Sequence, residues 1–499
     1  MVELARIAFV SLHTSPVASP GTADAGGMNV VELNSAMALA RAGHEVDLIT
    51  RRDDPDAPDR AEIAPGVRLI NLDAGPARVV AKSRAEALIE PFREAMGRLD
   101  HDYGLVHSHH WFSGVAALPL ARRWGVPHVQ SFHSVSAPPG THSLSDGEPP
   151  ESPGRPGGEA LVAEGSDLIV SVSEAERRTI IERYGPLSTP IVPVHPGVDA
   201  DRFHPLQPGE RHWAWGATGG CYYLFASRLQ PLKGPDLAIR MMAEIPEYDR
   251  PHLIVAGEAS QDFTDYEGRL HRLVHELGLD EHVVFLGSQN RDELACMLRG
   301  ACALINPSYS ETFSLVCLEA EASGAPVIAG RVGGIPEAVR DGVTGILLEG
   351  RDPAEWAAAA QSVRNDEALR ERWDVFAADV RHDANVIGTV GAIAAYERGD
   401  AWQREVKDLI RSNVDLVERA LADTPIDFVR PEGTYLTWWG FEGVDLGPLS
   451  PAATLRERAR IAANEGRTLG ADYASWARIN LACAPDAASR IVERVLGLL

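Results

Sequence analysis

Lysine is the scarcest charged residue in this chain. The 499 residues contain 47 basic side chains, and only Lys82, Lys233 and Lys407 are lysines, which leaves 44 arginines. A chain with so strong a preference for arginine keeps a lysine either by chance or where a compact ammonium group is needed. Lys82 and Lys233 are therefore candidate functional residues.

Cysteine is almost as scarce. No C-x-x-C pair is present, and the cysteine spacing matches no metal site. This usage predicts reduced core thiols in a cytoplasmic protein. The five residues concerned are Cys221, Cys296, Cys302, Cys317 and Cys483.

Long apolar runs and a cleavable leader are also missing. The opening MVELARIAFVSLHTS is typical of a strand and lacks the small-residue cleavage pattern of a signal peptide. No apolar run approaches the length that crosses a membrane. With 45% apolar and 24% charged residues, the composition is that of an ordinary globular protein, which we expect in the cytoplasm.

The formal net charge of -24 excludes two broad classes of partner. Nucleic acids and anionic membranes would both be repelled, so neither is expected to bind. An anionic ligand would have to be held by local arginine, lysine and helix termini. No D-x-D motif stands near SRLQPLKG, the segment with Arg228 and Lys233 that is a candidate anion site. We therefore predict no metal ligands, and a divalent ion would be optional.

Apolar runs alternate with helical patterns over most of the chain. The runs RIAFVSL, EVDLIT, GLVHSH and DLIVSV in the first half, and YYLFAS, HLIVAGE, HVVFLG and CALIN in the second, read as strands. Strands separated by helices predict an α/β fold with parallel sheets. Residues 190–205 read as a linker between two such units, and Ala137–Gly158, rich in proline, glycine and serine, reads as a long loop.

Two short motifs point to a ligand with hydroxyl and diphosphate groups. Glu311 and Glu319 bracket ETFSLVCLE, and Arg228 and Lys233 lie in SRLQPLKG. Carboxylates suit paired hydroxyls, whereas a guanidinium and an ammonium suit a diphosphate. A helix is expected to begin at Phe313, where its free amides would attract an anion. Each motif alone is more often a solvated surface, so their agreement carries the interpretation.

Together with PSYSE, GAPVIA and VGGIPEAV, these motifs resemble the donor half of family 4 retaining glycosyltransferases. The resemblance runs from about Arg6 to about Asp383. It implies the GT-B arrangement, with an N-terminal Rossmann-like acceptor domain at residues 1–190 and a nucleotide-sugar domain at 191–383. The ligand is then expected at the carboxyl ends of the strands.

The resemblance also assigns site residues. It implies that a departing diphosphate helps to accept the acceptor's proton during same-face attack, without a covalent carboxylate nucleophile. The implied catalytic residues are Arg228, Lys233, Glu311 and His133. The implied donor-binding residues are Gly26, Gly27, Arg228, Lys233, Phe313, Ser314, Leu315 and Glu319.

Three sequence segments resemble those of one branch of the family, the D-inositol-3-phosphate glycosyltransferases of mycothiol biosynthesis. They are SLHTSP…DAGGMNV, HSHHWFSG and FHS. In that branch Lys, Tyr, Thr and Arg bind the acceptor's phosphate. Lys82 and Arg155 match, Ser134 replaces the Thr, and His110 stands in place of the Tyr. The implied acceptor-binding residues are Asn29, Lys82, His110, Ser134 and Arg155. A protonated His110 would strengthen the phosphate preference on the acid side of neutrality.

Residues 384–499 differ in character. PEGTYLTWWGF and SWARINLACAP resemble the small domain of pyridoxal-phosphate enzymes of the cystathionine beta-lyase and aminotransferase group. There Arg478 would be a candidate carboxylate-binding residue. The large domain with its Schiff-base lysine is absent, and Lys407 lies in a helical pattern. We therefore expect no pyridoxal phosphate, and interpret this part as a remnant or an accessory module.

The combined expectation is an enzyme that moves a hexosyl unit from a nucleotide sugar, UDP-GlcNAc-like, to a polyol or inositol phosphate. No cofactor is required. The alternatives are a sucrose- or glucan-type member of the same family, and a fused protein that senses an amino acid without catalysis. A homodimer is compatible with the sequence.

Overall fold

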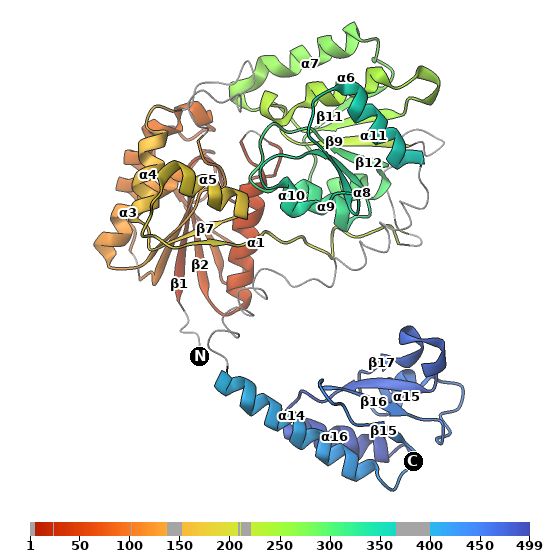
Figure 1. Ribbon diagram of the computed structural model, residues 1–499. Helices are drawn as coiled ribbons and strands as arrows, with labels where there is room; N and C mark the ends of the chain where they lie inside the picture. Colours follow the sequence, from red (N-terminus) through yellow and green to blue (C-terminus); the bar gives the residue numbers. More distant parts are fainter. Residues whose placement is uncertain are drawn as a thin grey trace. The chain divides into compact units, whose positions relative to one another are not determined.

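The structure is a computed structural model that describes residues 5–22, 24–100, 102–136, 152–207, 210, 221–365 and 400–499. The chain divides into two compact units, Met1–Val386 and Ile387–Leu499. The first unit contains two twisted sheets with helices on both faces, as the alternating pattern predicts (Figure 1). No helix within the described part of the chain is both long enough and apolar enough to cross a membrane.

The first sheet has the strand order β3-β4-β2-β1-β5-β6-β7-β8, and only β3 and β4 pair antiparallel. Its strands are β1 (Arg6–Ser11), β2 (Glu45–Arg51), β3 (Arg60–Ala64), β4 (Val67–Leu72), β5 (Leu105–His109), β6 (His128–Ser131), β7 (Leu168–Ser171) and β8 (Ile191–Pro193). Its helices are α1 (Gly27–Arg41), η1 (Lys82–Leu88), α2 (Ile89–Met96), α3 (His110–Trp124), α4 (Arg155–Gly165) and α5 (Glu174–Tyr184). Because β8 pairs with β7, this sheet continues just beyond the predicted boundary at residue 190.

Alternation along β1 explains why helices cover both faces of this sheet. Phe9 belongs to a buried cluster with Ala36 of α1, whereas Val10 belongs to a cluster with Phe92 of α2 and Phe112 of α3. Successive side chains of a strand point to opposite faces, so one strand feeds two apolar layers. Removing these side chains from water contributes about 25 cal/mol for each Å² of apolar surface.

The second sheet is entirely parallel, in the order β11-β10-β9-β12-β13-β14. Its strands are β9 (Tyr222–Ala226), β10 (His252–Ala256), β11 (Val283–Gly287), β12 (Ala303–Asn306), β13 (Val327–Gly330) and β14 (Gly345–Leu348). Its helices are η2 (Pro231–Lys233), α6 (Pro235–Glu244), η3 (Glu247–Asp249), η4 (Gln261–Phe263), α7 (Thr264–Glu276), α8 (Arg291–Gly300), α9 (Leu315–Ala322), α10 (Ile335–Ala338) and α11 (Pro353–Asn365). The predicted boundary at residue 383 lies outside the described residues.

Direct bonds join the two halves of the first unit. The Thr312 hydroxyl donates to the His133 carbonyl over 2.9 Å. The Glu337 carboxylate, on α10, accepts from the amides of Glu174 and Ala175 over 2.7 and 2.8 Å. Those amides open α5, where an anionic group is favoured. The carboxyl ends of the two sheets are thereby held face to face.

The expectation of a loop over Ala137–Gly158 needs one correction. Residues 137–151 lie outside the described part. Arg155 to Gly158, however, form the first turn of α4, with a proline at the beginning of the helix. Proline is tolerated there because the first helical amides need no intrahelical partner.

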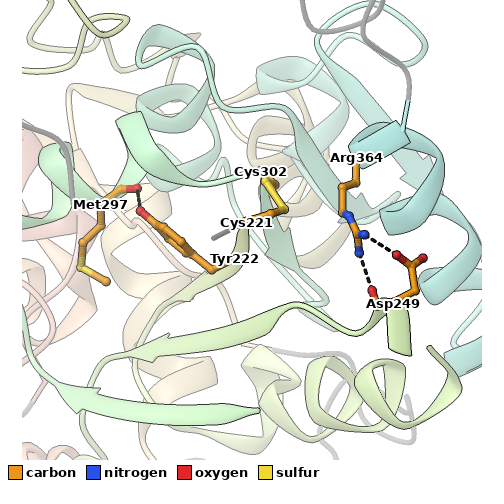
Figure 2. Close-up of a disulfide and its surroundings, with 6 residues drawn as sticks. All are labelled: Cys221, Tyr222, Asp249, Met297, Cys302 and Arg364. Atoms are coloured by element: carbon orange, nitrogen blue, oxygen red, sulfur yellow. Dashed lines mark hydrogen bonds and ion pairs between the residues drawn. A yellow bond between two sulfur atoms is a disulfide. The ribbon is translucent and has the colours of Figure 1, made fainter. Parts of the chain in front are cut away.

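The expectation of five reduced thiols is wrong for one pair. Cys221 and Cys302 form a disulfide, with their Cα atoms 5.8 Å apart (Figure 2). Each residue directly precedes one of the neighbouring parallel strands β9 and β12, and the Cys302 amide donates to the Tyr222 carbonyl over 2.9 Å. The strand order therefore brings together two cysteines that are 81 residues apart. Cys296, Cys317 and Cys483 take part in no disulfide in the described part of the chain, and Cys317 is buried.

The second unit contains an antiparallel sheet in the order β15-β16-β18-β17. Its elements are α14 (Asp400–Leu421), β15 (Asp427–Val429), β16 (Leu436–Gly440), α15 (Pro451–Arg458), β17 (Asn464–Glu465), η5 (Gly466–Leu469), η6 (Ala471–Tyr473), β18 (Trp476–Asn480) and α16 (Pro485–Leu496). Trp439 and Ile479 enter a buried cluster with Val417 of α14 and Val495 of α16. Lys407 lies within α14, as its helical pattern predicts.

Candidate active site

A cavity of about 660 Å³ lies between the two sheets of the first unit. Parallel sheets bind ligands at the carboxyl ends of their strands, and loops from both sheets reach this cavity at those ends. Among its lining residues are fourteen that the sequence predicts, which are Gly26, Gly27, Lys82, His110, His133, Ser134, Arg155, Arg228, Lys233, Glu311, Phe313, Ser314, Leu315 and Glu319.

Asn29 has a different position from the other predicted acceptor residues. Its side chain is buried and donates to the Thr14 hydroxyl over 3.2 Å and to the Ser15 carbonyl over 2.7 Å. Its oxygen accepts from the Gly26 amide over 2.9 Å. Asn29 therefore holds the glycine loop in place from behind, and its contact with an acceptor stays a prediction.

Lys233 and Glu311 are already paired in this structure. Lys233 ends η2 after β9, and its Nζ lies 2.7 Å from Oε1 of Glu311, which follows β12. The Ser308 hydroxyl donates to the same oxygen over 3.0 Å. Both charged side chains are mostly buried, so each compensates the desolvation of the other. An arriving diphosphate would compete with Glu311 for the ammonium.

The glycine pair of the first half approaches the donor motifs of the second half. A Cβ at Gly26 would lie 3.7 Å from Nε of Arg228, and one at Gly27 would lie 3.3 Å from Cδ1 of Leu315. The Arg228 guanidinium also donates to the Asp24 carbonyl over 3.3 Å. Glycine therefore leaves room for backbone amides and a ligand to approach each other here.

The helix after Glu311 begins later than predicted. α9 runs from Leu315 to Ala322, with Ser314 as its N-cap, and not from Phe313. Ser314 has a left-handed backbone, φ 83°, and its Oγ accepts from the Asn306 amide group over 2.8 Å. That turn leaves Phe313 free to stack on His195, with ring centroids 5.6 Å apart.

Glu319 has a partner that the sequence analysis missed. Its Oε1 lies 2.6 Å from Nη1 of Arg291, the first residue of α8. Burial raises the pKa of Glu319, and the guanidinium of Arg291 opposes that rise. The only sequence signal for Arg291 is its place after the capping residue Asn290, which indicates a helix start but no ligand.

The predicted acceptor residues converge at one part of the cavity. Nη2 of Arg155 donates to the Ser134 hydroxyl over 3.1 Å, and its Nε lies 2.7 Å from the buried Glu159 carboxylate. Lys82 opens η1 and lines the same cavity. Burial, followed by the positive charges of Lys82 and Arg155 among others, lowers the pKa of His110 well below its usual value. Both cations therefore act on one ring.

That pKa corrects the expectation for His110. The ring is buried, and neither of its nitrogens has a hydrogen-bond partner among the described residues. A depressed pKa keeps the imidazole neutral in the mildly acidic range. The expected gain in phosphate preference on the acid side of neutrality is therefore withdrawn.

His13 is a second residue that the sequence analysis missed. Its ring centroid lies 4.5 Å from that of His110, and its side chain lines the cavity. Burial and then Lys82 hold the pKa of His13 well below its usual value. A signal existed in SLHTS, which runs from the last residue of β1 into the loop after it, because residues after a parallel strand face the ligand edge.

Buried ionisable groups predict a stability maximum near pH 6.5. Burial lowers the pKa of six histidines well below its usual range, to about 3 for His107 and about 4 for His128 and His133, and lowers the pKa of His252 less. The other three of the six are His13, His109 and His110. Burial raises the pKa of Glu32 and Glu321 to about 8 and of Glu176 to about 7, and it also raises the pKa of Glu319, where Arg291 opposes the rise.

The signs of these shifts set the expected pH profile. Each histidine costs stability as pH falls below about 6.5, where the unfolded chain binds protons that the folded chain does not, by roughly 1.4 kcal/mol per pH unit. Each glutamate has the opposite sign down to about pH 4.5. We expect the more numerous histidines to outweigh the glutamates, so denaturant unfolding should show stability falling from pH 6.5 to 5. A continued rise over that range would contradict the assignment.

The described ranges contain no cluster of side chains that could bind a metal ion. No group of three or more histidine, cysteine, aspartate or glutamate side chains there is arranged to hold an ion. The predicted optional role of a divalent ion stays a prediction.

Arg478 lies on β18 of the second unit. Its Nη2 donates to the Asn464 side chain over 3.5 Å, and its Nε is buried without a hydrogen-bond partner among the described residues. The predicted carboxylate-binding role of Arg478 stays a prediction.

Two protein families match the first unit. The family described as Glycosyltransferase Family 4 matches residues 25–202, and the family described as Glycosyl transferases group 1 matches residues 212–379. The D-inositol 3-phosphate glycosyltransferase of Mycobacterium sp. (strain KMS) is 40% identical over 367 residues, which is 72% of this chain and 82% of that protein. The protein of the same name from Mycobacterium tuberculosis (strain ATCC 25177 / H37Ra) is 40% identical over 363 residues, 71% of this chain and 74% of that protein.

Solved structures agree on the fold. Sucrose-phosphate synthase from Thermosynechococcus elongatus has a TM-score of 0.69 and 27% identity, covering 80% of this chain and 98% of that one. The Anabaena protein HepE, in complex with UDP and glucose, has a TM-score of 0.60 and 18% identity, covering 79% and 100%. The facing sheets, the cavity between them and these likenesses lead to one conclusion: the chain belongs to the family 4 glycosyltransferases, is a hexosyltransferase and has the GT-B fold.

Proposed function

We propose that this enzyme transfers a hexosyl unit from a UDP-sugar, UDP-GlcNAc-like, to an inositol phosphate with retention at the anomeric carbon. The observation that carries the proposal is the placement of Lys82, Ser134 and Arg155 around one part of the cavity that also holds Lys233 and Glu311. Two cations and a hydroxyl suit a phosphate on the acceptor. The 40% identity to D-inositol 3-phosphate glycosyltransferases supports the same choice.

In the proposed reaction, the departing diphosphate of the donor acts as the base that accepts the acceptor's proton. The acceptor hydroxyl oxygen forms a bond to the anomeric carbon while the bond from that carbon to the diphosphate oxygen breaks. The hydroxyl proton passes to the departing phosphate oxygen on the same face. Arg228 and Lys233 stabilise the charge that develops there, and Glu311, paired with Lys233, is not needed as a nucleophile.

A second candidate keeps the donor and changes the acceptor to a sugar phosphate. It is favoured by the likeness to sucrose-phosphate synthase and by His110, which stands where the inositol-phosphate branch has tyrosine.

We also propose that the C-terminal unit works without covalent pyridoxal phosphate. Lys407 lies within α14, whereas a Schiff base needs a lysine held beside the cofactor.

Turnover with matched acceptors tests the proposal. Inositol 1-phosphate, inositol 3-phosphate, fructose 6-phosphate and free inositol would each be offered with UDP- and GDP-sugars. We expect an inositol phosphate with a UDP-sugar to give the highest kcat/KM. Equal turnover of free and phosphorylated inositol would exclude the phosphate site, and a preference for fructose 6-phosphate would select the second candidate.

A further inference from the structure

Three imidazoles form a continuous row that ends at the cavity. His107 and His109 lie two residues apart on β5, with ring centroids 4.3 Å apart. His133 follows β6, and its ring stacks on His109 with centroids 5.2 Å apart and planes at 20°. Nδ1 of His109 lies 2.9 Å from Nε2 of His133, so these two rings share a hydrogen bond.

His133 is constrained on two sides. Its backbone is in the left-handed region, φ 58°, which is uncommon for a residue other than glycine. Its carbonyl accepts from the Thr312 hydroxyl of the opposite half over 2.9 Å. Its ring lines the cavity and is bonded to His109 at Nε2. The contact with His109 therefore decides which nitrogen of His133 carries its proton.

We infer that His109 is a positioning residue, whose Nδ1–H donates to Nε2 of His133 and leaves the proton of His133 on Nδ1 as a donor toward the cavity. This rests on the proposed function and on the catalytic role that the family resemblance implies for His133, whose ring would face the donor sugar. The role is to hold and orient, since His109 itself does not line the cavity. His133 would then donate to a sugar hydroxyl and would not act as a base.

The direction of the hydrogen bond follows from the other nitrogen of His109. Burial lowers the pKa of both His109 and His133, so each ring is neutral and carries one proton. Nε2 of His109 is buried, has no hydrogen-bond partner among the described residues, and belongs to a ring packed against Phe9 and His107. If His109 carried its proton there, a donor would be buried unpaired. Unpaired buried N–H groups are rare, so the proton is placed on Nδ1.

Three variants separate positioning from packing. His109→Phe keeps a ring in the stack and removes the hydrogen bond, and we expect kcat to fall about tenfold or more because His133 loses its orientation. His109→Asn retains an N–H near the position of Nδ1 and should recover most of that loss. His107→Phe is the matched control, because its Nε2 bonds to the Ser131 hydroxyl over 2.9 Å and not to His133. It should stay within about threefold of the parent enzyme.

A tautomer measurement tests the inference without turnover. In protein labelled with ¹⁵N-histidine, Nδ1 of His133 should show the shift of a protonated nitrogen and Nε2 that of an unprotonated one, with assignment by loss of the signals in His133→Gln. The reversed pattern would overturn the inference, as would full activity of His109→Phe. If the proposed acceptor is wrong instead, turnover with inositol phosphate fails in all proteins while the tautomer result stands.

Discussion

Replacing Lys233 by alanine is expected to lower kcat/KM by at least about a hundredfold, the usual effect of removing a group that stabilises developing charge. The ammonium lies 2.7 Å from Glu311, and the two side chains are only 14% and 13% exposed. Its loss removes the diphosphate's partner and leaves the mostly buried Glu311 carboxylate without the opposite charge that compensates it. Steady-state kinetics and the UDP-induced shift in Tm would measure both effects.

A control variant and a double variant separate the loss of the diphosphate's partner from the loss of stability. Lys407→Ala removes an exposed lysine of α14 and should leave kinetics unchanged. In Lys233→Ala/Glu311→Gln the uncompensated carboxylate is gone, so stability should partly return while activity does not. A Lys233→Ala protein that kept the full UDP-induced shift would show that the diphosphate binds elsewhere.

Replacing Lys82 by methionine is expected to remove most of the preference for phosphorylated over free inositol. A hydrogen bond to a charged group is worth about 1.5–3 kcal/mol, which corresponds to roughly 10- to 150-fold in kcat/KM for the phosphorylated acceptor. Free inositol has no phosphate to lose, so its turnover should change little. Kinetics with both acceptors at one fixed concentration of the UDP-sugar would give the ratio.

The neighbouring arginine of the same short helix provides the control. Arg84 is exposed, and Arg84→Met should leave the acceptor ratio unchanged. Arg155→Met should lower the ratio as Lys82→Met does, but it also breaks the bond to Glu159, so its stability must be measured alongside. An unchanged ratio in both Lys82→Met and Arg155→Met would refute the phosphate assignment.

The sequence predicted the fold, and most of the site residues that it predicted line the cavity, because the relevant information is local. Alternating apolar runs mark parallel strands, and residues just after such strands reach one edge of the sheet, where Lys233 and Glu311 lie. Contacts between side chains that are far apart in the sequence could not be predicted from such local patterns. Arg291 with Glu319, and Cys221 with Cys302, meet only because of helix placement and the order of β9 and β12 in the sheet.

The motifs also gave no sign of how charge is distributed in the ligand-free site. His110 matched a position that binds phosphate, and only its burial beside Lys82 explains why its pKa is depressed. His13 was overlooked because a single histidine in a loop is more often structural than functional. Both rings depend on how loops of the first sheet fold over one another, which a pattern of residue types does not record.

The bonds between the two halves limit what a dissected protein could report. Arg228 belongs to the nucleotide-sugar half, yet it donates to Asp24, and Thr312 of that half holds the backbone of His133. A fragment containing only the second sheet would keep the Lys233–Glu311 pair but lose the surface that orients Arg228. Its affinity for UDP would describe an incomplete site, so binding constants for this enzyme should be measured on a chain that contains both halves.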